Sequence, residues 1–250
     1  MSLLNILRMS ANKTLRYLGV SIVQLRGLPG ERRSKIISHH GIQTVVDVGA
    51  NNGSYGSELR ASGYSGRIIS FEPTAQAYRS LATRAKKDRL WETQQTALGA
   101  SPGEATINVA ENGAASSSLL KMRDFHKQCS PHSGFVSSEN VNITTLDIAL
   151  GGLLRSQDKV LLKIDVQGYE HMVLKGACEI IPHVDLIECE LSFVKLYDGQ
   201  LLFEEMLYLL KELGFSPVQF VPGFTDPRTG HALQVDGIFA RCVPANGVAT

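Results

Sequence analysis

Residues 43–55 constrain the fold of this chain more than any other segment; they read Gln-Thr-Val-Val-Asp-Val-Gly-Ala-Asn-Asn-Gly-Ser-Tyr. An apolar, β-branched run reaches Asp47 and breaks into the turn Gly49-x-Asn51-x-Gly53, and a helical pattern opens directly afterwards. A strand, a glycine turn and a helix N-terminus in this order form the ligand-binding corner of a doubly wound α/β sheet. A tight loop without a ligand is the alternative for this segment taken alone.

The side chains in this turn indicate which cofactor it binds. A dinucleotide turn reads G-x-G-x-x-G, and its middle glycine lets the backbone approach a pyrophosphate. Here Asn51 fills the middle position and Ser54 the last, so side chains occupy the space that phosphates need. S-adenosylmethionine has no phosphates; backbone N–H groups beside Gly49 and Gly53 suit its carboxylate, and Asp47 suits its ammonium group. An NAD-dependent oxidoreductase is the rival interpretation.

A second acidic residue ends the next predicted strand. Residues 67–73 read Arg-Ile-Ile-Ser-Phe-Glu-Pro, which places Glu72 about one βαβ repeat beyond the glycine turn. An acid at this position accepts the ribose hydroxyls of a nucleoside. Pro73 then stops the strand and can begin a helix. An acid before a proline is often a solvated strand end, but the two features on successive strands favour a cofactor site.

The remaining pattern predicts a doubly wound, mostly parallel, Rossmann-like α/β sheet of seven strands. Residues 160–166 are almost continuously apolar, as in a central parallel strand that is buried on both faces. We expect strands from Thr44 and at 67–71, 93–98, 160–166, 185–191, 217–221 and 235–241, the last of them antiparallel. We expect helices after Leu28-Pro29-Gly30, over 75–87 and over 201–213.

The sequence divides into an N-terminal helical extension over residues 1–40 and one domain over 41–243, with a small β insertion at about 104–145. Two predicted strands of the insertion, 105–110 and 141–144, flank a polar loop typical of a functional segment. The extension carries one acid, Glu31, and seven basic residues: Arg8, Lys13, Arg16, Arg26, Arg32, Arg33 and Lys35. Its leucines and isoleucines suit an amphipathic arm that rests on an anionic membrane surface, covers the site or caps the sheet.

The composition argues against several classes of protein. The 250 residues carry a formal net charge of +1, whereas a dedicated nucleic-acid-binding domain is normally basic. No C-x-x-C spacing or disulfide framework connects the four cysteines, Cys129, Cys178, Cys189 and Cys242. No apolar stretch is long enough for a membrane span, and no signal-peptide pattern is present. We expect a cytoplasmic protein that binds no nucleic acid, with the basic arm as its candidate for peripheral membrane contact.

The segment 162–170, Leu-Lys-Ile-Asp-Val-Gln-Gly-Tyr-Glu, leaves the fourth predicted strand and enters a helix. Asp165 is expected at the carboxyl end of that strand, beside the switch point where doubly wound sheets bind ligands. Lys163 shares its face by alternation, so a satisfied ion pair between the two is the alternative. By the same alternation Glu188 and Glu190 share one face of the fifth strand.

In these motifs the chain resembles the FkbM-type S-adenosylmethionine-dependent methyltransferases. The resemblance covers about residues 41–240, and its motifs are specific in combination. The matching segments are Asp47-Val48-Gly49-Ala50-Asn51-x-Gly53-x-Tyr55, Phe71-Glu72-Pro73, Ala97-Leu98-Gly99, Thr145-Leu146-Asp147, Lys163-Ile164-Asp165-x-x-Gly168-x-Glu170, Leu174-Lys175-Gly176 and Asp236-x-x-Phe239. Gln167 departs from the pattern, since many relatives carry Glu there, and we assign it no catalytic charge.

The resemblance implies a class I methyltransferase fold and methylation of a hydroxyl on a sugar, glycolipid or other hydroxylated natural product. It implies S-adenosylmethionine as cofactor, held by Asp47, Gly49, Asn51, Gly53, Tyr55 and Glu72. Ala97 and Leu98 are expected to flank the adenine. Two alternatives stay open: a methyltransferase-like binding protein without catalysis, and a nucleic-acid methyltransferase, which should show a basic or aromatic groove that the sequence outside the arm lacks.

A positioned base helps methyl transfer to an alcohol, because a protonated hydroxyl is a poor nucleophile. Asp165 is the first candidate for this base and Glu190 the second, and Lys163 completes the predicted catalytic set. Three histidines in loop-like segments are expected at the surface: His126, His132 and His231. Carboxylates near one cleft can hold a divalent ion, but no ligand spacing demands one, so we predict no metal.

Overall fold

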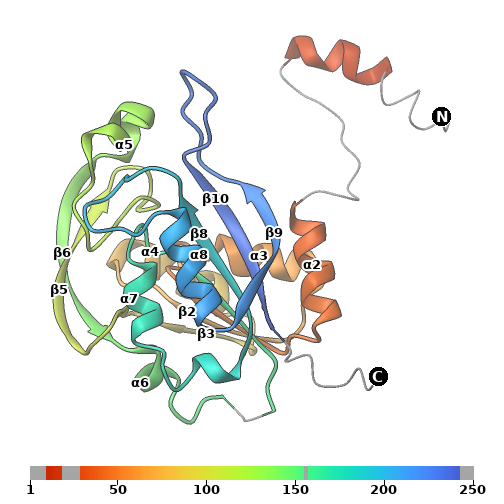
Figure 1. The fold of residues 1–250 in the computed structure, drawn as a ribbon, viewed down its shortest axis with the longest axis vertical. Helices are drawn as coiled ribbons and strands as arrows, with labels where there is room; N and C mark the ends of the chain where they lie inside the picture. The colour runs from red at the N-terminus through yellow and green to blue at the C-terminus, as the bar shows by residue number, and fades with distance from the viewer. Residues whose placement is uncertain (1–9, 19–28, 155–156, 243–250) are drawn as a thin grey trace.

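The computed structural model describes residues 10–18, 29–154 and 157–242. These residues form two β-sheets, and helices cover both faces of the larger one (Figure 1). The larger sheet has the order β3-β2-β1-β7-β8-β10-β9. Its strands are β1 (Thr44–Val48), β2 (Arg67–Phe71), β3 (Trp91–Gln94), β7 (Val160–Ile164), β8 (Val184–Ser192), β9 (Phe215–Pro222) and β10 (Gln234–Arg241). The predicted seven-stranded, doubly wound sheet is therefore confirmed.

The strand directions place the switch point where the sequence analysis expects it. Neighbouring strands from β3 to β8 run parallel, and β10 is antiparallel to both β8 and β9. The order of the strands reverses between β1 and β7, which lie side by side although β2 and β3 come between them in the sequence. The carboxyl ends of β1, β2 and β7 consequently meet at one edge of the sheet.

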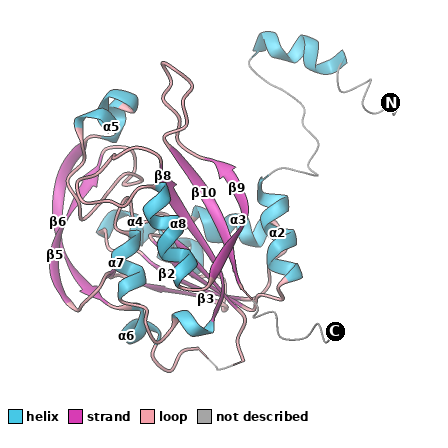
Figure 2. Ribbon diagram, viewed as in Figure 1, coloured by secondary structure: helices cyan, strands magenta, loops and turns pink. Residues whose placement is uncertain are grey.

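Helices lie on both faces of this sheet (Figure 2), and their apolar side chains pack against it. Val45 and Val46 illustrate the division, because successive strand residues point to opposite faces and these two belong to different cores. The Val45 core receives side chains from α2 (Pro29–His39), α3 (Ser54–Ala61) and α4 (Ala75–Ala85). The Val46 core receives them from α6 (Leu146–Leu150), α7 (Glu170–Lys175) and α8 (Phe203–Glu212). The remaining short helices are α5 (Asp124–Cys129), η1 (Arg16–Leu18), η2 (Pro131–Ser133) and η3 (Ile181–His183).

The insertion forms a second sheet of three strands in the order β4-β6-β5. These strands are β4 (Ala97–Leu98), β5 (Gly103–Ala110) and β6 (Phe135–Thr144). The single strand predicted at 93–98 is wrong, because β3 ends at Gln94 in the large sheet and β4 pairs with β6 in the small one. The Thr96 hydroxyl donates to the Asn142 carbonyl at 3.0 Å, which turns the chain toward β6.

The N-terminal extension contributes one helix to the sheet. Ile37 of α2 is buried in the same core as Val45. Upstream, residues 10–15 are helical and continue into η1, and no side chain of residues 10–18 is buried. The rest of the predicted amphipathic arm lies outside the described residues. Within the three described ranges no helix is long and apolar enough to cross a membrane.

Candidate active site

The turn after β1 begins at Gly49, where only glycine fits. Its φ is +78°, and a Cβ there would lie 1.9 Å from the backbone oxygen of Asp165. The turn is therefore pressed against the end of β7, where the Asp165 N–H donates to the Val48 carbonyl at 3.0 Å. This close approach brings the functional residues of β1 and β7 together.

Every backbone N–H from residue 49 to residue 54 already has an acceptor. The first two donate to the Phe71 carbonyl, both at 3.0 Å. The amides of Asn52 and Ser54 donate to the side-chain oxygens of Asn51 and Asn52, at 2.5 and 3.1 Å. The turn is thus closed by its own asparagines, and a ligand carboxylate would have to replace one of these oxygens.

Glu72 follows β2 and braces the same turn. Its Oε1 accepts hydrogen bonds from the N–H and the hydroxyl of Thr74, at 2.8 and 2.6 Å. Its Oε2 accepts one from the Asn51 N–H at 2.9 Å. A carboxylate offers about four acceptor positions, so one remains on Oε2 for a ligand hydroxyl. Burial raises the pKa of Glu72, and the hydrogen bonds from Thr74 and Asn51 act in the opposite direction.

A cavity of about 330 Å³ lies between the glycine turn, Glu72 and the insertion. Ala97 and Leu98 of β4 and Ile107 of β5 give it an apolar wall. Segment 112–119 of the insertion lines the cavity as well, and the Asn51 side-chain amide donates to the Gly113 carbonyl at 3.1 Å. The cavity is therefore built from both sheets, and its volume is typical of a small-molecule site.

A second pocket of about 160 Å³ adjoins the first, and Asp165 lines both. It lies over the carboxyl halves of β7 and β8, beside β10, α2 and α3. Most of its lining is polar or charged: Arg33, Tyr55, Glu58, Lys163, Asp165, Glu188, Glu190 and Asp236. Strand register brings these residues together. Lys163 pairs with Glu188 across β7 and β8, and Asp236 pairs with Glu190 across β10 and β8.

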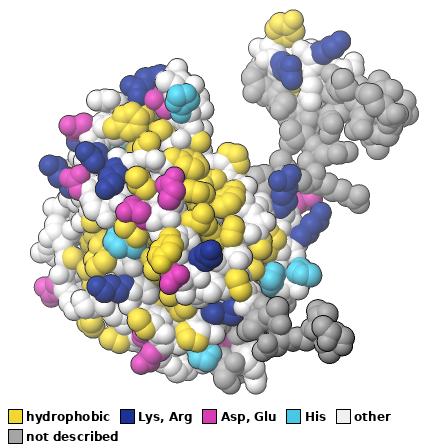
Figure 3. All heavy atoms as spheres, in the orientation of Figure 1, with side chains coloured by type: hydrophobic (Ala, Val, Ile, Leu, Met, Phe, Trp, Pro, Cys, Tyr) yellow, Lys and Arg dark blue, Asp and Glu magenta, His cyan; other side chains and the backbone are white. Residues whose placement is uncertain are grey.

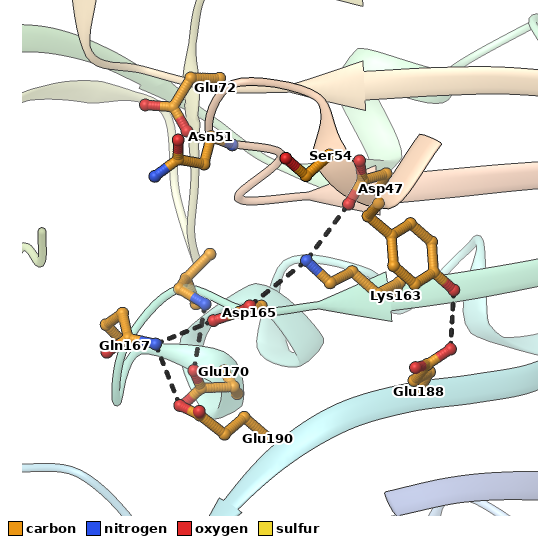
Figure 4. Close-up of polar contacts among 12 residues, drawn as sticks. Asp47, Asn51, Ser54, Glu72, Lys163, Asp165, Gln167, Glu170, Glu188 and Glu190 are labelled. Carbon is orange, nitrogen blue, oxygen red and sulfur yellow. Dashed lines mark hydrogen bonds and ion pairs between the residues drawn. The ribbon is translucent and has the colours of Figure 1, made fainter. Parts of the chain in front are cut away.

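Lys163 lies between two carboxylates, as Figure 4 shows. Its Nζ is 3.3 Å from Oδ1 of Asp47 and 3.4 Å from Oδ2 of Asp165. Burial lowers the pKa of Lys163, but the charges of Asp165 and Asp47 outweigh it and raise that pKa overall. The ion pair that alternation suggested is therefore present. It lies at the pocket, where a permanent ammonium stabilises the Asp165 carboxylate.

Glu190 and Gln167 complete the acidic corner (Figure 4). The side-chain amide of Gln167 donates to Oδ1 of Asp165 at 2.9 Å and to Oε2 of Glu190 at 3.0 Å. Gln234 of β10 donates to the same Glu190 oxygen. Burial, and next the charge of Asp165, raises the pKa of Glu190 well above its usual value. Sequence reasoning gave Gln167 no role, because a single neutral amide carries no chemical signal.

Asp236 is a pocket residue that the sequence analysis quoted only as part of a motif. It faces Glu190 across β10 and β8, and burial, with the charge of Asp165 next, raises its pKa to about 6. The alternation of β10 was the available signal, because Asp236 and Ile238 share a face and Ile238 pairs with Glu188.

Three residues predicted to bind the cofactor do not line the larger cavity: Asp47, Gly53 and Tyr55. The Tyr55 hydroxyl donates to Oε2 of Glu188 at 2.7 Å, and Arg33 of α2 binds Oε1 of the same carboxylate at 3.0 Å. Burial raises the pKa of Tyr55 well above its usual value. Asp47 is fully buried and accepts a hydrogen bond from the Ser70 hydroxyl at 3.2 Å. Their contact with a cofactor stays a prediction.

The histidines lie away from both pockets. His132 and His231 are exposed, as predicted. His126 is not a surface residue: it is 3% exposed in α5 and packs against Tyr197 and Phe224. Burial lowers its pKa to about 4. Among the residues that the structure describes, no three His, Cys, Asp or Glu side chains are arranged to hold a metal ion.

The larger cavity fits S-adenosylmethionine. Glu72 retains an acceptor position for a ribose hydroxyl, and the walls from Ala97 and Leu98 suit an adenine. Asn51 and Ser54 occupy the turn where a dinucleotide needs room for its phosphates. A doubly wound sheet with this cavity at its switch point and carboxylates beside it is an arrangement that suits an S-adenosylmethionine-dependent methyltransferase.

Comparison with known families also identifies the chain as a methyltransferase and assigns it to one family. The model of the methyltransferase FkbM domain matches residues 47–217, and the chain belongs to this family. The cofactor of this family of methyltransferases is S-adenosylmethionine. No curated protein sequence matches the chain.

Solved structures resemble the chain in fold. One is the magnesium protoporphyrin IX methyltransferase of Synechocystis PCC 6803 with bound S-adenosylmethionine, at 11% identity and a TM-score of 0.44, covering 95% of this chain and 96% of that one. Another is an rRNA methylase from Streptococcus thermophilus, at 11% identity and a TM-score of 0.44, covering 85% and 95% of the two chains.

Proposed function

We propose that this protein transfers the methyl group of S-adenosylmethionine to a hydroxyl of a sugar, a glycolipid or another hydroxylated natural product. The observation that carries the proposal is the pair of adjoining cavities that share Asp165. The larger fits the cofactor. The smaller is lined by carboxylates and by the ammonium and guanidinium groups of Lys163 and Arg33, which together can accept from and donate to several hydroxyls of one acceptor.

The chain's own residues supply positioning and proton transfer. Bound S-adenosylmethionine supplies a methyl group on a positively charged sulfur. Asp165 lies where the two cavities meet, so its carboxylate can accept the hydrogen of an acceptor hydroxyl and take that proton as the oxygen is methylated. Lys163 orients Asp165 through their ion pair. Glu190, held by two amides, orients neighbouring hydroxyls in the smaller pocket.

The charge of the smaller pocket favours a neutral polyol over a nucleic acid. Five carboxyl groups line it against two cations: Glu58, Asp165, Glu188, Glu190 and Asp236 against Arg33 and Lys163. Even without the charge of Glu190, whose pKa is raised, the acids outnumber the cations. Phosphates approaching this pocket would meet net negative charge, whereas nucleic-acid sites neutralise phosphates with Lys and Arg. We therefore propose that the acceptor carries hydroxyls rather than a phosphate backbone.

Calorimetric titration tests the cofactor half of the proposal. Wild-type protein is titrated with S-adenosylmethionine, with S-adenosylhomocysteine and with NAD, and the same is done for Glu72→Ala. We expect the first two to bind and NAD not to bind. Glu72→Ala removes the carboxylate that braces the turn, so it should weaken the binding of S-adenosylmethionine and of S-adenosylhomocysteine by at least about tenfold, or about 1.4 kcal/mol. Binding of NAD alone would show an oxidoreductase, and binding of none would favour a protein without catalysis.

A labelled-methyl assay tests the transfer itself. Tritiated S-adenosylmethionine is supplied with neutral sugars, glycolipids and RNA, and each product is counted. We expect counts in a hydroxylated small molecule or glycolipid and none in RNA. Asp165→Asn should lower kcat by about 100-fold or more while the cofactor still binds. Asp124→Asn, a substitution at a residue whose side chain is 93% exposed on α5, is the matched control and should keep full activity.

We also propose that the enzyme is a cytoplasmic protein that reaches a glycolipid acceptor at the membrane surface. In the described part of the arm, Tyr17 is 93% exposed and Leu18 is 75% exposed, beside the basic Lys13 and Arg16. Figure 3 shows further hydrophobic side chains gathered around α8 on the viewed face. Such a combination suits an anionic lipid surface. Co-sedimentation with anionic and neutral vesicles tests it: deleting residues 1–28 should abolish binding to the anionic ones, and persistent binding would disprove it.

A further inference from the structure

Gln167 occupies a strained position in the loop between β7 and α7. Its φ is +57°, in the left-handed region that side chains other than Gly, Asn and Asp seldom adopt. Asn51 and Ala114 are the other such residues in the described chain, and all three line the larger cavity. A conformation of this kind persists only where its surroundings hold it in place. The contacts of Gln167 show what holds it.

The side-chain amide of Gln167 bridges two carboxylates. One NH₂ group donates to Asp165 Oδ1 at 2.9 Å and to Glu190 Oε2 at 3.0 Å. The first carboxylate comes from the end of β7 and the second from β8. An amide NH₂ has two donors and no charge, so it can hold two carboxylates close together without adding a third charge to the pair. Glutamate at this position would instead place like charges in contact.

The oxygens of Gln167 tie this bridge to the insertion. Its side-chain oxygen accepts from the Tyr197 hydroxyl at 2.9 Å, and its backbone oxygen accepts from the Ser118 hydroxyl at 2.8 Å. The Tyr197 hydroxyl also lies 3.0 Å from the Ser116 carbonyl. Ser118 lines the cofactor cavity, and Tyr197 is fully buried. One residue therefore contacts the acid pair on one side and the loop over the cavity on the other.

We propose that Gln167 is a positioning residue that clamps Asp165 and Glu190 together and couples them to the loop over the cofactor cavity. This inference rests on the proposed function, since it assigns the clamp to the same methyl-transfer site. The neutral amide of Gln167 thus has a positioning role at the two acids. It keeps the two carboxylates oriented. Through it, a ligand in the larger cavity changes the surroundings of Asp165 and Glu190.

Carboxyl ¹³C NMR titration tests the clamp without any acceptor. Protein labelled at Asp and Glu is titrated between about pH 4 and pH 9, free and with S-adenosylhomocysteine, in wild type, Gln167→Asn and Gln167→Glu. Asp165→Asn and Glu190→Gln assign the two resonances. Asn tolerates the left-handed backbone but is one methylene too short to bridge the acids. Glu keeps the length and brings a third carboxyl group. Gln128→Glu, exposed on α5, controls for added charge.

In wild type we expect S-adenosylhomocysteine to shift the carboxyl resonances of both Asp165 and Glu190. Gln167→Asn should raise the pKa of Glu190 above its wild-type value, because a donor to the charged form of that carboxyl group is lost. Gln167→Glu should raise it further, and Gln128→Glu should leave it unchanged. In Gln167→Asn the ligand should still bind, but the shift at Glu190 should disappear.

The results separate the clamp from the proposed function. Wild-type titration curves in both Gln167 variants would overturn the clamp. An unchanged ligand-induced shift at Glu190 in Gln167→Asn would overturn the coupling. If S-adenosylhomocysteine fails to bind wild-type protein, the proposed function falls, and the titrations of the free proteins still decide whether Gln167 holds the two acids.

Discussion

Gly49 and Gly41 both have positive φ, at +78° and +64°, but only Gly49 is packed against other backbone. A Cβ at Gly49 would lie 1.9 Å from a backbone oxygen, whereas no described atom beyond the chain neighbours lies within 4 Å of one at Gly41. We predict that Gly49→Ala lowers the free energy of unfolding by at least about 3 kcal/mol, and Gly41→Ala by about 1 kcal/mol. Urea unfolding of both variants measures this. Equal losses would mean that only the dihedral angle matters.

Glu170 is a buried carboxylate whose ionisation opposes folding. Its Oε1 accepts from the N–H groups of Val166 and Gly168, at 3.1 and 3.0 Å, and so fastens the loop that carries Gln167. Burial raises its pKa to about 7. Because the folded pKa exceeds the unfolded one, the contribution to stability is complete below about pH 4.5 and is lost as the pH rises through about 7.

We predict that Glu170→Gln flattens the pH dependence of unfolding. The variant keeps the accepting oxygen but cannot ionise, so between about pH 5 and pH 8 it should lose less stability than wild type. At about pH 8 it should be the more stable protein, by about 2–3 kcal/mol. Glu104→Gln, at an exposed position of β5, should follow the wild-type curve. Urea unfolding at each pH gives the comparison, and parallel curves for wild type and Glu170→Gln would contradict the prediction.

Sequence reasoning found the residues whose positions follow from local pattern. Glu72 and Asp165 stand at strand ends, so a motif and a period of two place them. The partners of Glu190 could not be predicted from the sequence. Asp236 lies opposite Glu190 because of the register of β8 with β10, and Gln167 contacts Glu190 because of the turn after β7. His126 was assigned to the surface because its segment looks like a loop in the sequence, yet tertiary packing buries it.

Helix α2 links the N-terminal extension to the acceptor pocket. Ile37 is buried in the sheet core, and Arg33 binds Glu188, which is 5% exposed. Removing α2 would therefore leave a buried carboxylate without its guanidinium, which costs about 3–5 kcal/mol. The segment before α2 makes no such contribution in its described part, residues 10–18.

We predict that two N-terminal deletions behave differently. Removing residues 1–28 should leave the melting temperature and the affinity for S-adenosylhomocysteine unchanged. Removing residues 1–40 should lower the melting temperature by about 10 °C or more, given about 2–4 °C per kcal/mol for a domain of this size. Differential scanning fluorimetry and calorimetric titration of both proteins measure this. A stable 41–250 fragment would show that α2 is a dispensable addition rather than part of the folded domain.

The strands of the large sheet were predictable, and the small sheet was predictable only in part. Continuous apolar runs identify β7 and β8 because both of their faces are buried. At residues 93–98 the sequence reads as one strand, since no glycine or proline separates β3 from β4. β4 joins the small sheet because it pairs with β6, some 45 residues away along the chain. The local sequence pattern does not indicate a pairing of this kind.

The cofactor cavity lies between the two sheets and so connects them. Gly49 and Glu72 line it from the large sheet, and Ala97, Leu98 and Ile107 line it from the small one. Hydrogen bonds already join the two walls: the Asn51 amide donates to the Gly113 carbonyl, the Ala75 N–H donates to Glu139 of β6 at 2.8 Å, and the Ser118 hydroxyl donates to the Gln167 carbonyl at 2.8 Å. A ligand that fills the cavity would add contacts to both walls. The insertion could then open locally only after the ligand had dissociated.

We predict that S-adenosylhomocysteine slows amide hydrogen exchange in the insertion by at least about tenfold, which corresponds to about 1.4 kcal/mol of added local stability. The protected segments should be β4, β5 and residues 112–119, because these supply the lining residues on the small-sheet side of the cavity. Strand β9, at the far edge of the large sheet, should exchange at nearly its ligand-free rate and serves as the internal control. Glu72→Ala should abolish the protection. Slowing in β9 equal to that in β5 would mean that the ligand stabilises the fold globally and that the insertion opens only with the rest of the domain.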